Sequence, residues 1–437
     1  MKDRNAKKNF SIKPMSLRKN FSWTLIGNII YAGCQWGILI ILAKLGSPEM
    51  VGKYSLGLAI TAPIMLLTNL QLRGIQATDT KDLYKFGDYL GLRLITSLVA
   101  FFIVIIFVWF ANYPLETTIV ITIILLSKII ESISDVVYGL LQRNEYMDKI
   151  SVSMILRGVL SLFGLGIVVW ITKSIVFGTI ALAITWFIVL VLYDLKNAVN
   201  FALLKPLFQF STIKKIVKLS LPLGVVLMLG SLNTNLPRYF LEFFTDEETL
   251  GYFSAMAYLI VAGNTIINAL GQSATPRLAK YFASGNIRGF KNLMFKLVGI
   301  ALFVGVVGLI IALLFGKQVL TLIYQEDYAV YSDVFVIIML SGAINYAGSF
   351  FGYGMTAARM FKIQPLIGIC WLVTGLIASI LLIPSYGLMG AAYTLVLSSA
   401  VQFVTKGLVI VYLLYVKRIE NLDGDSTCRG NKDNVIV

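Results

Sequence analysis

Three charged side chains share one face of an apolar segment that is long enough to span a bilayer. Lys128, Glu131 and Asp135 stand at i, i+3 and i+7, and Tyr138 and Gln142 continue the spacing. At 3.6 residues per turn, all five fall on one side of a helix. Because a charge at the bilayer centre costs about 2.5–3.5 kcal/mol on insertion scales, such side chains face a bundle interior, a water-filled cavity or one another. The stripe predicts a polar pathway within a membrane bundle; a buried ion-pair cluster that only fixes helix packing is the alternative.

Further cations lie inside predicted spans and are candidates for function on the same physical ground: Arg93, Arg157, Arg238 and Lys406. Asp135 lies shortly before the end of its span, and Arg157 lies equally far into the next one. A short loop between antiparallel neighbours places the two at similar depth. We therefore predict an Asp135–Arg157 ion pair, which Glu131 can join, because pairing offsets part of the desolvation cost of each charge.

The second half of the chain has its own polar stripe. In the predicted span 219–241 it occupies i, i+4, i+7 and i+11, with the residues Ser231, Asn235, Arg238 and Glu242. Pro237 lies among them and removes a backbone hydrogen bond, so we expect a kink or an unwound turn there. In the last predicted span, Gln402 and Lys406 share a face.

The composition indicates an integral membrane protein. The chain has 437 residues, of which 58% are hydrophobic and 14% charged, with a mean hydropathy of +0.82. Soluble domains carry about 25% charged residues. The sequence has no histidine, its cysteines show no metal-ligand spacing, and it has no phosphate-binding P-loop. We therefore expect no metal, no cofactor and no catalytic residue, and a protein that is not an enzyme.

Twelve apolar segments of about the length that a spanning helix needs follow a basic N-terminal arm. They predict an all-α membrane protein with two six-helix lobes. The predicted domains are a cytoplasmic arm 1–22, an N-terminal lobe 23–194, a linker 195–218, a C-terminal lobe 219–414 and a cytoplasmic tail 415–437.

Lysine and arginine predict the orientation of the chain. Most of them lie in the two termini and in the loops on the same side, whereas the opposite loops hold only Lys44, Lys53, Lys173 and Lys317. Since Lys and Arg favour the cytoplasmic side, both termini are predicted to be cytoplasmic. The net charge of +15 follows from the same bias, so we expect no nucleic-acid partner.

A short internal repeat links the two halves. When Gly52 is aligned with Gly251, Glu49 also matches Glu248. Both segments are predicted turns between the first two spans of a half, so the repeat is parallel, with its axis along the membrane normal. Separately, the cations and phenylalanines of 275–296 predict a short amphipathic helix on the cytoplasmic face, with a solvated basic loop as the alternative.

Several segments resemble bacterial polysaccharide-export flippases, the Wzx-type members of the multidrug/oligosaccharidyl-lipid/polysaccharide superfamily. The similarity runs from about Leu17 to Tyr415. It rests on NLQLRGIQATD (69–79), DVVYGLLQRNEYMDKISVSMILRGVLSL (135–162), SLPLG (220–224), LNTNLPRYFLE (232–242) and ALGQSATPRLAKYF (269–282).

The resemblance implies a MATE-like, V-shaped pair of lobes that opens to one side at a time. The implied substrate is an oligosaccharide linked through pyrophosphate to undecaprenol, moved to the outer leaflet of the bacterial inner membrane. The implied substrate-binding residues are Lys128, Arg157, Arg238, Lys406, Asn235, Arg73 and Arg93. Of these, Arg73 and Arg93 are expected at the cytoplasmic mouth. An arginine site in the first span is not implied, because the sequence has no arginine between Ser22 and Lys44.

Energy for such transport comes from an ion gradient or from consumption of the product. Glu131 and Asp135 are buried carboxylates close to cations and are the candidates for binding H⁺ or Na⁺. A polysaccharide polymerase and a chain-length regulator are the expected protein partners, beside membrane lipids. Two alternatives remain: a cation-coupled multidrug exporter of the same superfamily, and a non-transporting scaffold of a polysaccharide assembly complex.

Overall fold

The computed structural model describes residues 17–79, 83–360 and 363–430, and these ranges contain helices and no strand. Most of the predicted cytoplasmic arm and the end of the predicted tail therefore lie outside the described residues. The chain divides into two compact units, Met1–Leu232 and Asn233–Val437. Each is described below by itself.

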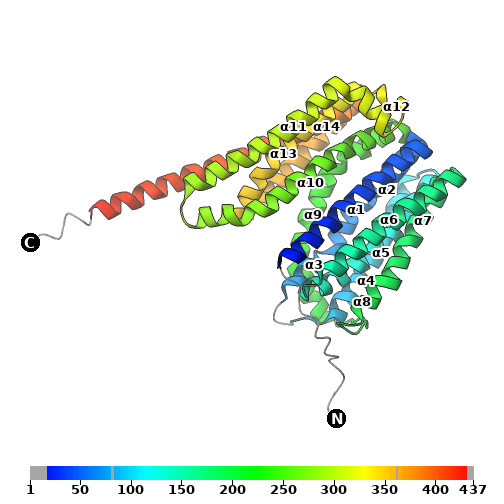
Figure 1. Ribbon diagram of the computed structural model, residues 1–437, viewed down its shortest axis with the longest axis horizontal. Helices are drawn as coiled ribbons and strands as arrows, with labels where there is room; N and C mark the ends of the chain where they lie inside the picture. The colour runs from blue at the N-terminus through cyan, green and yellow to red at the C-terminus, as the bar shows by residue number, and fades with distance from the viewer. Residues whose placement is uncertain (1–16, 80–82, 361–362, 431–437) are drawn as a thin grey trace, which may run out of the picture. The chain divides into compact units, whose positions relative to one another are not determined.

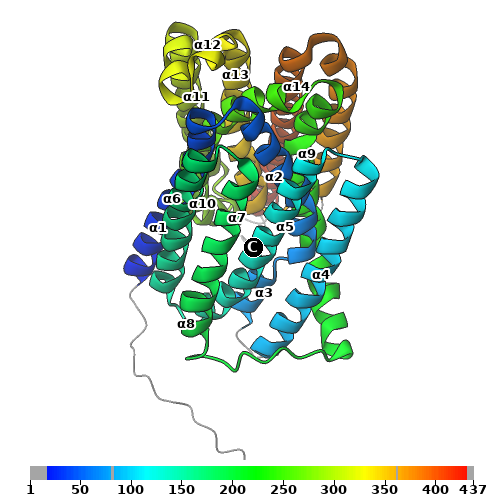
Figure 2. The ribbon, with the colours of Figure 1, turned by 90° about the vertical axis from the view of Figure 1, so that its right-hand side faces the viewer.

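The first unit is built around a central helix. In chain order its helices are α1 (Leu17–Leu45), α2 (Pro48–Asn69), α3 (Leu72–Thr78), α4 (Phe86–Ala111), α5 (Leu115–Arg143), α6 (Met147–Thr172), α7 (Ile175–Val189), the π-helix η1 (Leu190–Leu195), α8 (Lys196–Ala198) and the start of α9 (Phe210–Phe244). Helix α5 packs against α2, α3, α4, α6 and α7. Helix α1 lies along α6 in both views (Figures 1 and 2).

The second unit contains the end of α9 followed by α10 (Glu247–Ala283), α11 (Ile287–Ile323), the short α12 (Glu326–Ala329), α13 (Ser332–Ala357) and α14 (Gln364–Gly430). Helix α13 packs against α10, α11 and α14 and is the centre of this unit. Helix α14 is interrupted at Gly387, whose φ of 52° lies in the left-handed region that favours glycine.

Helix α4 shows that the first unit buries polar side chains and exposes apolar ones, the reverse of a soluble protein. Arg93 and Ser97 on one face are buried. On another face, Phe102, Ile106 and Trp109 are 53%, 53% and 75% exposed. Large apolar side chains that face outward, with polar ones packed inside, are the arrangement expected in lipid. The protein is therefore a multi-pass membrane protein.

Within the described ranges, ten helices are long and apolar enough to cross a membrane. Helix α5, which is 29 residues long and carries Lys128, Glu131 and Asp135, is not among them. The stretch Gln364–Tyr415 is one of the ten, although its 52 residues exceed a single crossing and bend at Gly387. The predicted total of twelve crossings would follow from adding α5 and dividing α14, and it stays a prediction.

The predicted repeat has a counterpart at the start of two helices. Ser47 caps α2 and Asp246 caps α10, each accepting a hydrogen bond from the backbone N–H three residues later, at 3.3 and 2.7 Å. These caps are separated by the same offset as the aligned glycines Gly52 and Gly251, which are both buried. The two halves thus enter their second long helix in the same way.

The predicted amphipathic helix is wrong, and of the two possibilities predicted at Pro237 the unwound turn is not present. The segment 275–296 is not a separate amphipathic helix, because α10 continues to Ala283 and α11 begins at Ile287. Only a tight turn through Gly285, with φ 69°, separates the two helices. No turn is unwound at Pro237, since α9 remains helical from Phe210 to Phe244. A kink at Pro237 stays a prediction. Transmembrane helices tolerate proline because neighbouring groups satisfy the freed carbonyl.

The segment that follows α8 is anchored to α4 through glycine. The Leu207 N–H donates to the Gly87 carbonyl oxygen at 2.8 Å. A Cβ at Gly91 would lie 2.1 Å from the carbonyl oxygen of Leu207, closer than real contacts allow. Glycine at this position is therefore required for the segment to lie against the start of α4, next to the buried Arg93.

We expect Gly91→Ala to destabilise the protein by about 1–3 kcal/mol, the usual cost of overpacking, because the Leu207 backbone has to move. Gly33→Ala is the matched control, since nothing lies within 4 Å of the added methyl group and alanine favours helix. Thermal unfolding of both purified variants in detergent is the measurement. Equal melting temperatures would show that the anchor does not constrain the fold.

Candidate functional site

The first unit contains a polar cavity of about 550 Å³. All five residues of the predicted stripe on α5 line it. The full lining is Tyr31, Met65, Leu66, Asn69, Gln71, Arg73, Gly74, Lys128, Glu131, Ser132, Asp135, Tyr138, Gln142, Met154, Arg157 and Leu227. The prediction that the stripe faces the interior of a bundle is thus confirmed, and the spacing along α5 is what places these side chains together.

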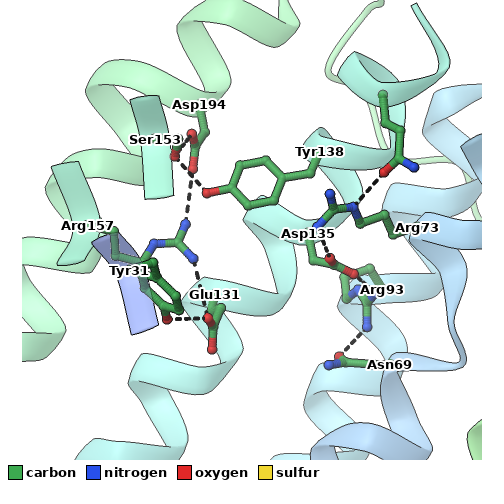
Figure 3. A network of polar contacts seen from close by, with 11 residues as sticks. Tyr31, Asn69, Arg73, Arg93, Glu131, Asp135, Tyr138, Ser153, Arg157 and Asp194 are labelled. Carbon is green, nitrogen blue, oxygen red and sulfur yellow. Dashed lines mark hydrogen bonds and ion pairs between the residues drawn. The ribbon is translucent and has the colours of Figure 1, made fainter. Parts of the chain in front are cut away.

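Glu131 is the centre of the first charged cluster. Its Oε2 lies 2.9 Å from the Nζ of Lys128, one turn earlier on α5. Its Oε1 accepts a hydrogen bond from the Tyr31 hydroxyl on α1 at 2.7 Å. The same Oε1 lies 3.7 Å from a guanidinium nitrogen of Arg157 on α6. One carboxylate therefore ties three helices together (Figure 3).

Arg157 has a second and closer carboxylate partner, Asp194. The two are 3.2 Å apart, and their side chains are 2% and 0% exposed. The other oxygen of Asp194 accepts a hydrogen bond from Ser153, which in turn lies 2.7 Å from the Tyr138 hydroxyl. The guanidinium carbon of Arg157 also lies 5.7 and 5.4 Å from the ring centroids of Tyr138 and Trp186. Arg157 is thus held in a buried ion pair with aromatic neighbours.

Asp135 is the centre of a second cluster, one turn further along α5. It pairs with Arg73 on α3 at 3.7 Å and with Arg93 on α4 at 3.4 Å. Arg93 also donates to the side-chain oxygen of Asn69, and the Nε of Arg73 donates to Gln142 at 2.9 Å. Figure 3 shows this cluster beside the first, on the other side of Tyr138.

A glycine on α5 makes the second cluster possible. A Cβ at Gly139 would lie 2.4 Å from the terminal amide of the Gln76 side chain and 3.2 Å from the Cα of Arg73. The short helix α3 therefore lies directly on the backbone of α5. This close approach brings Arg73 within reach of both Asp135 and Gln142.

The predicted Asp135–Arg157 pair is wrong. Arg157 pairs with Asp194 and Glu131, and Asp135 pairs with Arg73 and Arg93. The reason is rotational: a depth comparison along two adjacent helices ignores the direction of each side chain and the partners that other helices supply. Glu131 does pair with Arg157, but in a cluster that does not include Asp135.

The two arginines predicted at the cytoplasmic mouth differ in position. The side chain of Arg73 is 30% exposed and lines the cavity. The side chain of Arg93 is 0% exposed and lies behind Asp135, outside the cavity lining. A role for Arg93 in guiding a ligand inward would require Asp135 and Asn69 to move first.

Sequence reasoning missed Asp194, Tyr31 and Trp186. It placed Asp194 at the end of the N-terminal lobe and gave it no role in the site, whereas the helical path continues past it through η1 and α8. The available signal was the isolated acidic residue within an otherwise apolar run before Lys196. Tyr31 and Trp186 carry no charge and gave no sequence signal of their own.

The predicted residues of the second half lie in the second unit. The guanidinium of Arg238 donates to Asn235 at 2.9 Å and to the hydroxyl of Ser254 at 3.4 Å. The Nζ of Lys406 lies 4.5 Å from the ring centroid of Trp371. Across the residues that the structure describes, neither cation forms an ion pair with a carboxylate. These cations differ in this respect from those of the first unit.

Comparison with known proteins identifies relatives over most of the chain. A family model described as polysaccharide biosynthesis protein matches residues 17–282. The capsular polysaccharide biosynthesis protein CapF of Staphylococcus aureus is 32% identical over 404 residues, which are 92% of this chain and 99% of that protein.

Solved structures share the fold at low sequence identity. An inward-facing MATE family multidrug resistance transporter of the MOP superfamily matches with a TM-score of 0.73 and 13% identity, over 90% of this chain and 99% of that chain. The lipid II flippase MurJ, in an inward closed conformation, matches with a TM-score of 0.72 and 13% identity, over 89% of this chain and 87% of that chain. The predicted MATE-like helical membrane fold is confirmed.

We expect Asp194→Asn to destabilise the protein by about 3–5 kcal/mol, because it leaves the buried Arg157 without its closer counter-charge. Glu116→Gln is the matched control, since this carboxylate is half exposed and its partner Lys53 also pairs with Glu49 at 2.5 Å. We expect this substitution to cost much less, because Lys53 keeps a counter-charge. Denaturant or thermal unfolding in detergent separates the two. An Asp194→Asn protein as stable as the control would contradict a structural role for the pair.

Proposed function

This chain belongs to the polysaccharide biosynthesis protein family, and we propose that it is a flippase for lipid-linked oligosaccharides. The proposed substrate is an oligosaccharide joined through pyrophosphate to undecaprenol, carried from the cytoplasmic to the outer leaflet of the bacterial inner membrane. The observation that carries the proposal is the polar cavity of the first unit, which is lined by Arg73, Lys128 and Arg157. The name of CapF and the fold shared with the flippase MurJ support the same function.

A lipid headgroup with phosphates and sugars cannot cross hydrocarbon unaided, because each buried charge or unpaired hydroxyl loses its hydration. A cavity within a helical bundle supplies replacement partners. The guanidinium groups of Arg73 and Arg157 suit phosphate oxygens geometrically, and Lys128 adds a mobile ammonium group. The tail of the lipid can remain in the bilayer throughout, so only the head needs a polar path.

The second unit would contribute cations that no carboxylate neutralises in the described part of the chain. Arg238 with its neighbour Asn235 and Lys406 beside Trp371 are the candidates. Because an intramembrane charge without a partner is costly, an anionic ligand is the natural counter-charge for each.

The charge balance of the first unit suggests how transport can be coupled to an ion. Glu131 and Asp135 neutralise much of the charge on the cavity cations. A phosphate that enters must compete with these carboxylates. Protonation of Glu131 would release Lys128, whose only ion pair in the described residues is with Glu131, and would leave Arg157 paired with Asp194. A proton on Glu131 and a bound phosphate therefore favour one another; Na⁺ at either carboxylate is the alternative coupling ion.

We further propose that both termini lie in the cytoplasm and that the translocated unit passes to a polysaccharide polymerase and its chain-length regulator. The orientation rests on the distribution of Lys and Arg. The partners follow from the chemistry of the product, since a translocated repeat unit has to be joined to others before it becomes a polysaccharide.

We expect Lys128→Ala to reduce surface polysaccharide at least tenfold in cells that lack their own copy of the gene, and Lys128→Arg to retain most of it. The physical reason is that a cation at this position contacts the phosphates after it leaves Glu131. Lys173→Ala is the matched control, because this exposed lysine bonds only to the Leu45 carbonyl oxygen at 3.0 Å in the described residues.

Membrane abundance of each protein has to be measured beside the polysaccharide. If Lys128→Ala and Lys128→Arg both behave as wild type, the stripe on α5 is structural only. If the wild-type protein instead exports cationic dyes and leaves polysaccharide unchanged, the multidrug alternative replaces the flippase.

We expect Glu131→Gln to bind undecaprenyl pyrophosphate about tenfold more tightly than wild type at neutral pH, a difference of about 1.4 kcal/mol. The substitution removes the negative charge while it keeps the side-chain shape. Wild-type binding should tighten as the pH falls, because protonation of Glu131 releases Lys128, and the Glu131→Gln variant should lack this part of the response. Titration of purified protein over a pH series measures both. A pH response unchanged by the substitution would exclude Glu131 as the coupling group.

A further inference from the structure

The second unit has an apolar groove of about 340 Å³ among α11, α13 and α14. It is separate from the polar cavity of the first unit and from the candidate substrate residues. Its lining residues are Lys291, Met294, Phe295, Phe351, Phe403, Val404, Gly407, Leu408, Ile410, Val411 and Leu414. Every side chain in this set is apolar except that of Lys291.

The groove opens on the lipid-facing side of α14. Val404, Leu408 and Val411 recur at helical spacing and are 54%, 63% and 64% exposed. On a membrane-spanning helix, exposed apolar side chains of this kind contact hydrocarbon chains. Lys406 and Trp371 do not line the groove. The occupant of the groove therefore comes from the bilayer and not from the polar interior.

Aromatic rings and a glycine give the groove its depth. The rings of Phe351 and Phe403 lie 5.2 Å apart and form one wall. Gly407 lies beside them, where a Cβ would contact the Phe351 ring at 3.5 Å. A side chain longer than alanine at this position would occupy the space that a hydrocarbon chain can enter.

Lys291 marks one end of the groove with a positive charge. It lies on the exposed surface near the start of α11, with its Nζ 5.7 Å from the ring centroid of Phe295. No carboxylate pairs with it in the described ranges. A lysine near the end of a spanning helix reaches to the headgroup region, where an anionic lipid contributes about 1 kcal/mol per Lys or Arg.

We propose that this groove is a binding site for one phospholipid with an anionic headgroup. One acyl chain lies against the wall formed by Phe351 and Phe403, beside Leu408, and the phosphate pairs with Lys291. The lining favours this occupant over the sugar-pyrophosphate substrate, because the groove offers a single polar group and the hydroxyls of a sugar would stay unpaired. The site goes beyond the proposed transport function and does not depend on it.

The test is lipid-dependent thermal stability of the full-length protein in detergent. Phosphatidylglycerol and phosphatidylcholine with identical acyl chains are titrated separately. We expect phosphatidylglycerol to raise the melting temperature of the wild-type protein saturably and phosphatidylcholine to raise it much less. Lys291→Gln should lose the difference between the two lipids, and Lys291→Arg should retain it.

Three further variants distinguish the contribution of the headgroup from that of the acyl chain. Lys296→Gln is the matched control, since this exposed lysine lies on the same helix but does not line the groove, and it should respond as wild type. Gly407→Leu fills the groove and should weaken the response to phosphatidylglycerol at least tenfold in half-saturating concentration, whereas Gly407→Ala should change it little.

Equal stabilisation of the wild-type protein by both phospholipids would overturn the proposal, as would a full response in Lys291→Gln. Undecaprenyl phosphate is added as a separate arm. If it alone raises the melting temperature, the groove takes the polyprenyl lipid and the assignment to a phospholipid is wrong. None of these outcomes changes the transport test on Lys128, so failure here and failure of the flippase proposal can be told apart.

Discussion

The cost of placing charge inside a membrane bundle determines the arrangement of the first unit. Helix α5 carries a cation and two carboxylates on one stripe, and none of them can face lipid cheaply. Each is therefore matched by a group from another helix or from the next turn. Glu131 joins α1, α5 and α6, and Asp135 joins α3, α4 and α5. The ion pairs specify which helices are neighbours and at what rotation, while the apolar outer surface specifies only that they are in a membrane.

The same network explains why the cavity can be both structural and functional. Arg157 and Asp194 are buried and closely paired, so the Arg157 guanidinium is held in a fixed position at the edge of the cavity. Lys128, Glu131 and Arg73 are about one quarter to one third exposed and line open space. These partly exposed groups can exchange a protein partner for a ligand without leaving an uncompensated charge in the core. The cavity therefore combines a closely packed ion-pair cluster with partly exposed charged groups, the two arrangements that were alternatives at the level of sequence.

Membership of the polysaccharide biosynthesis family and the shared fold fit this division. The MATE family transporter and MurJ resemble this chain over most of its length at 13% identity, so the fold persists while the side chains differ. What distinguishes one member from another must then lie in the residues that line its cavities. In this chain the residues that line the polar cavity of the first unit are charged and nearly balanced. The second unit holds Arg238 and Lys406, which have no carboxylate partner within the described residues.

The sequence by itself determined the membrane environment, the approximate extent of most spans and the face on which the stripe of α5 lies. These properties are local, because hydropathy depends on composition and the shared face depends only on the helical repeat. It also indicated the matched starts of α2 and α10, where Ser47 and Asp246 cap equivalent turns.

Only the tertiary structure decided which charges pair. Asp135 faces Arg73 and Arg93, not Arg157, because α3 lies on Gly139 and brings Arg73 close. Asp194 belongs to the site because the helix after α7 continues through η1. Pairing depends on the rotation and depth of helices that are distant in sequence, and no spacing rule within one segment contains that information.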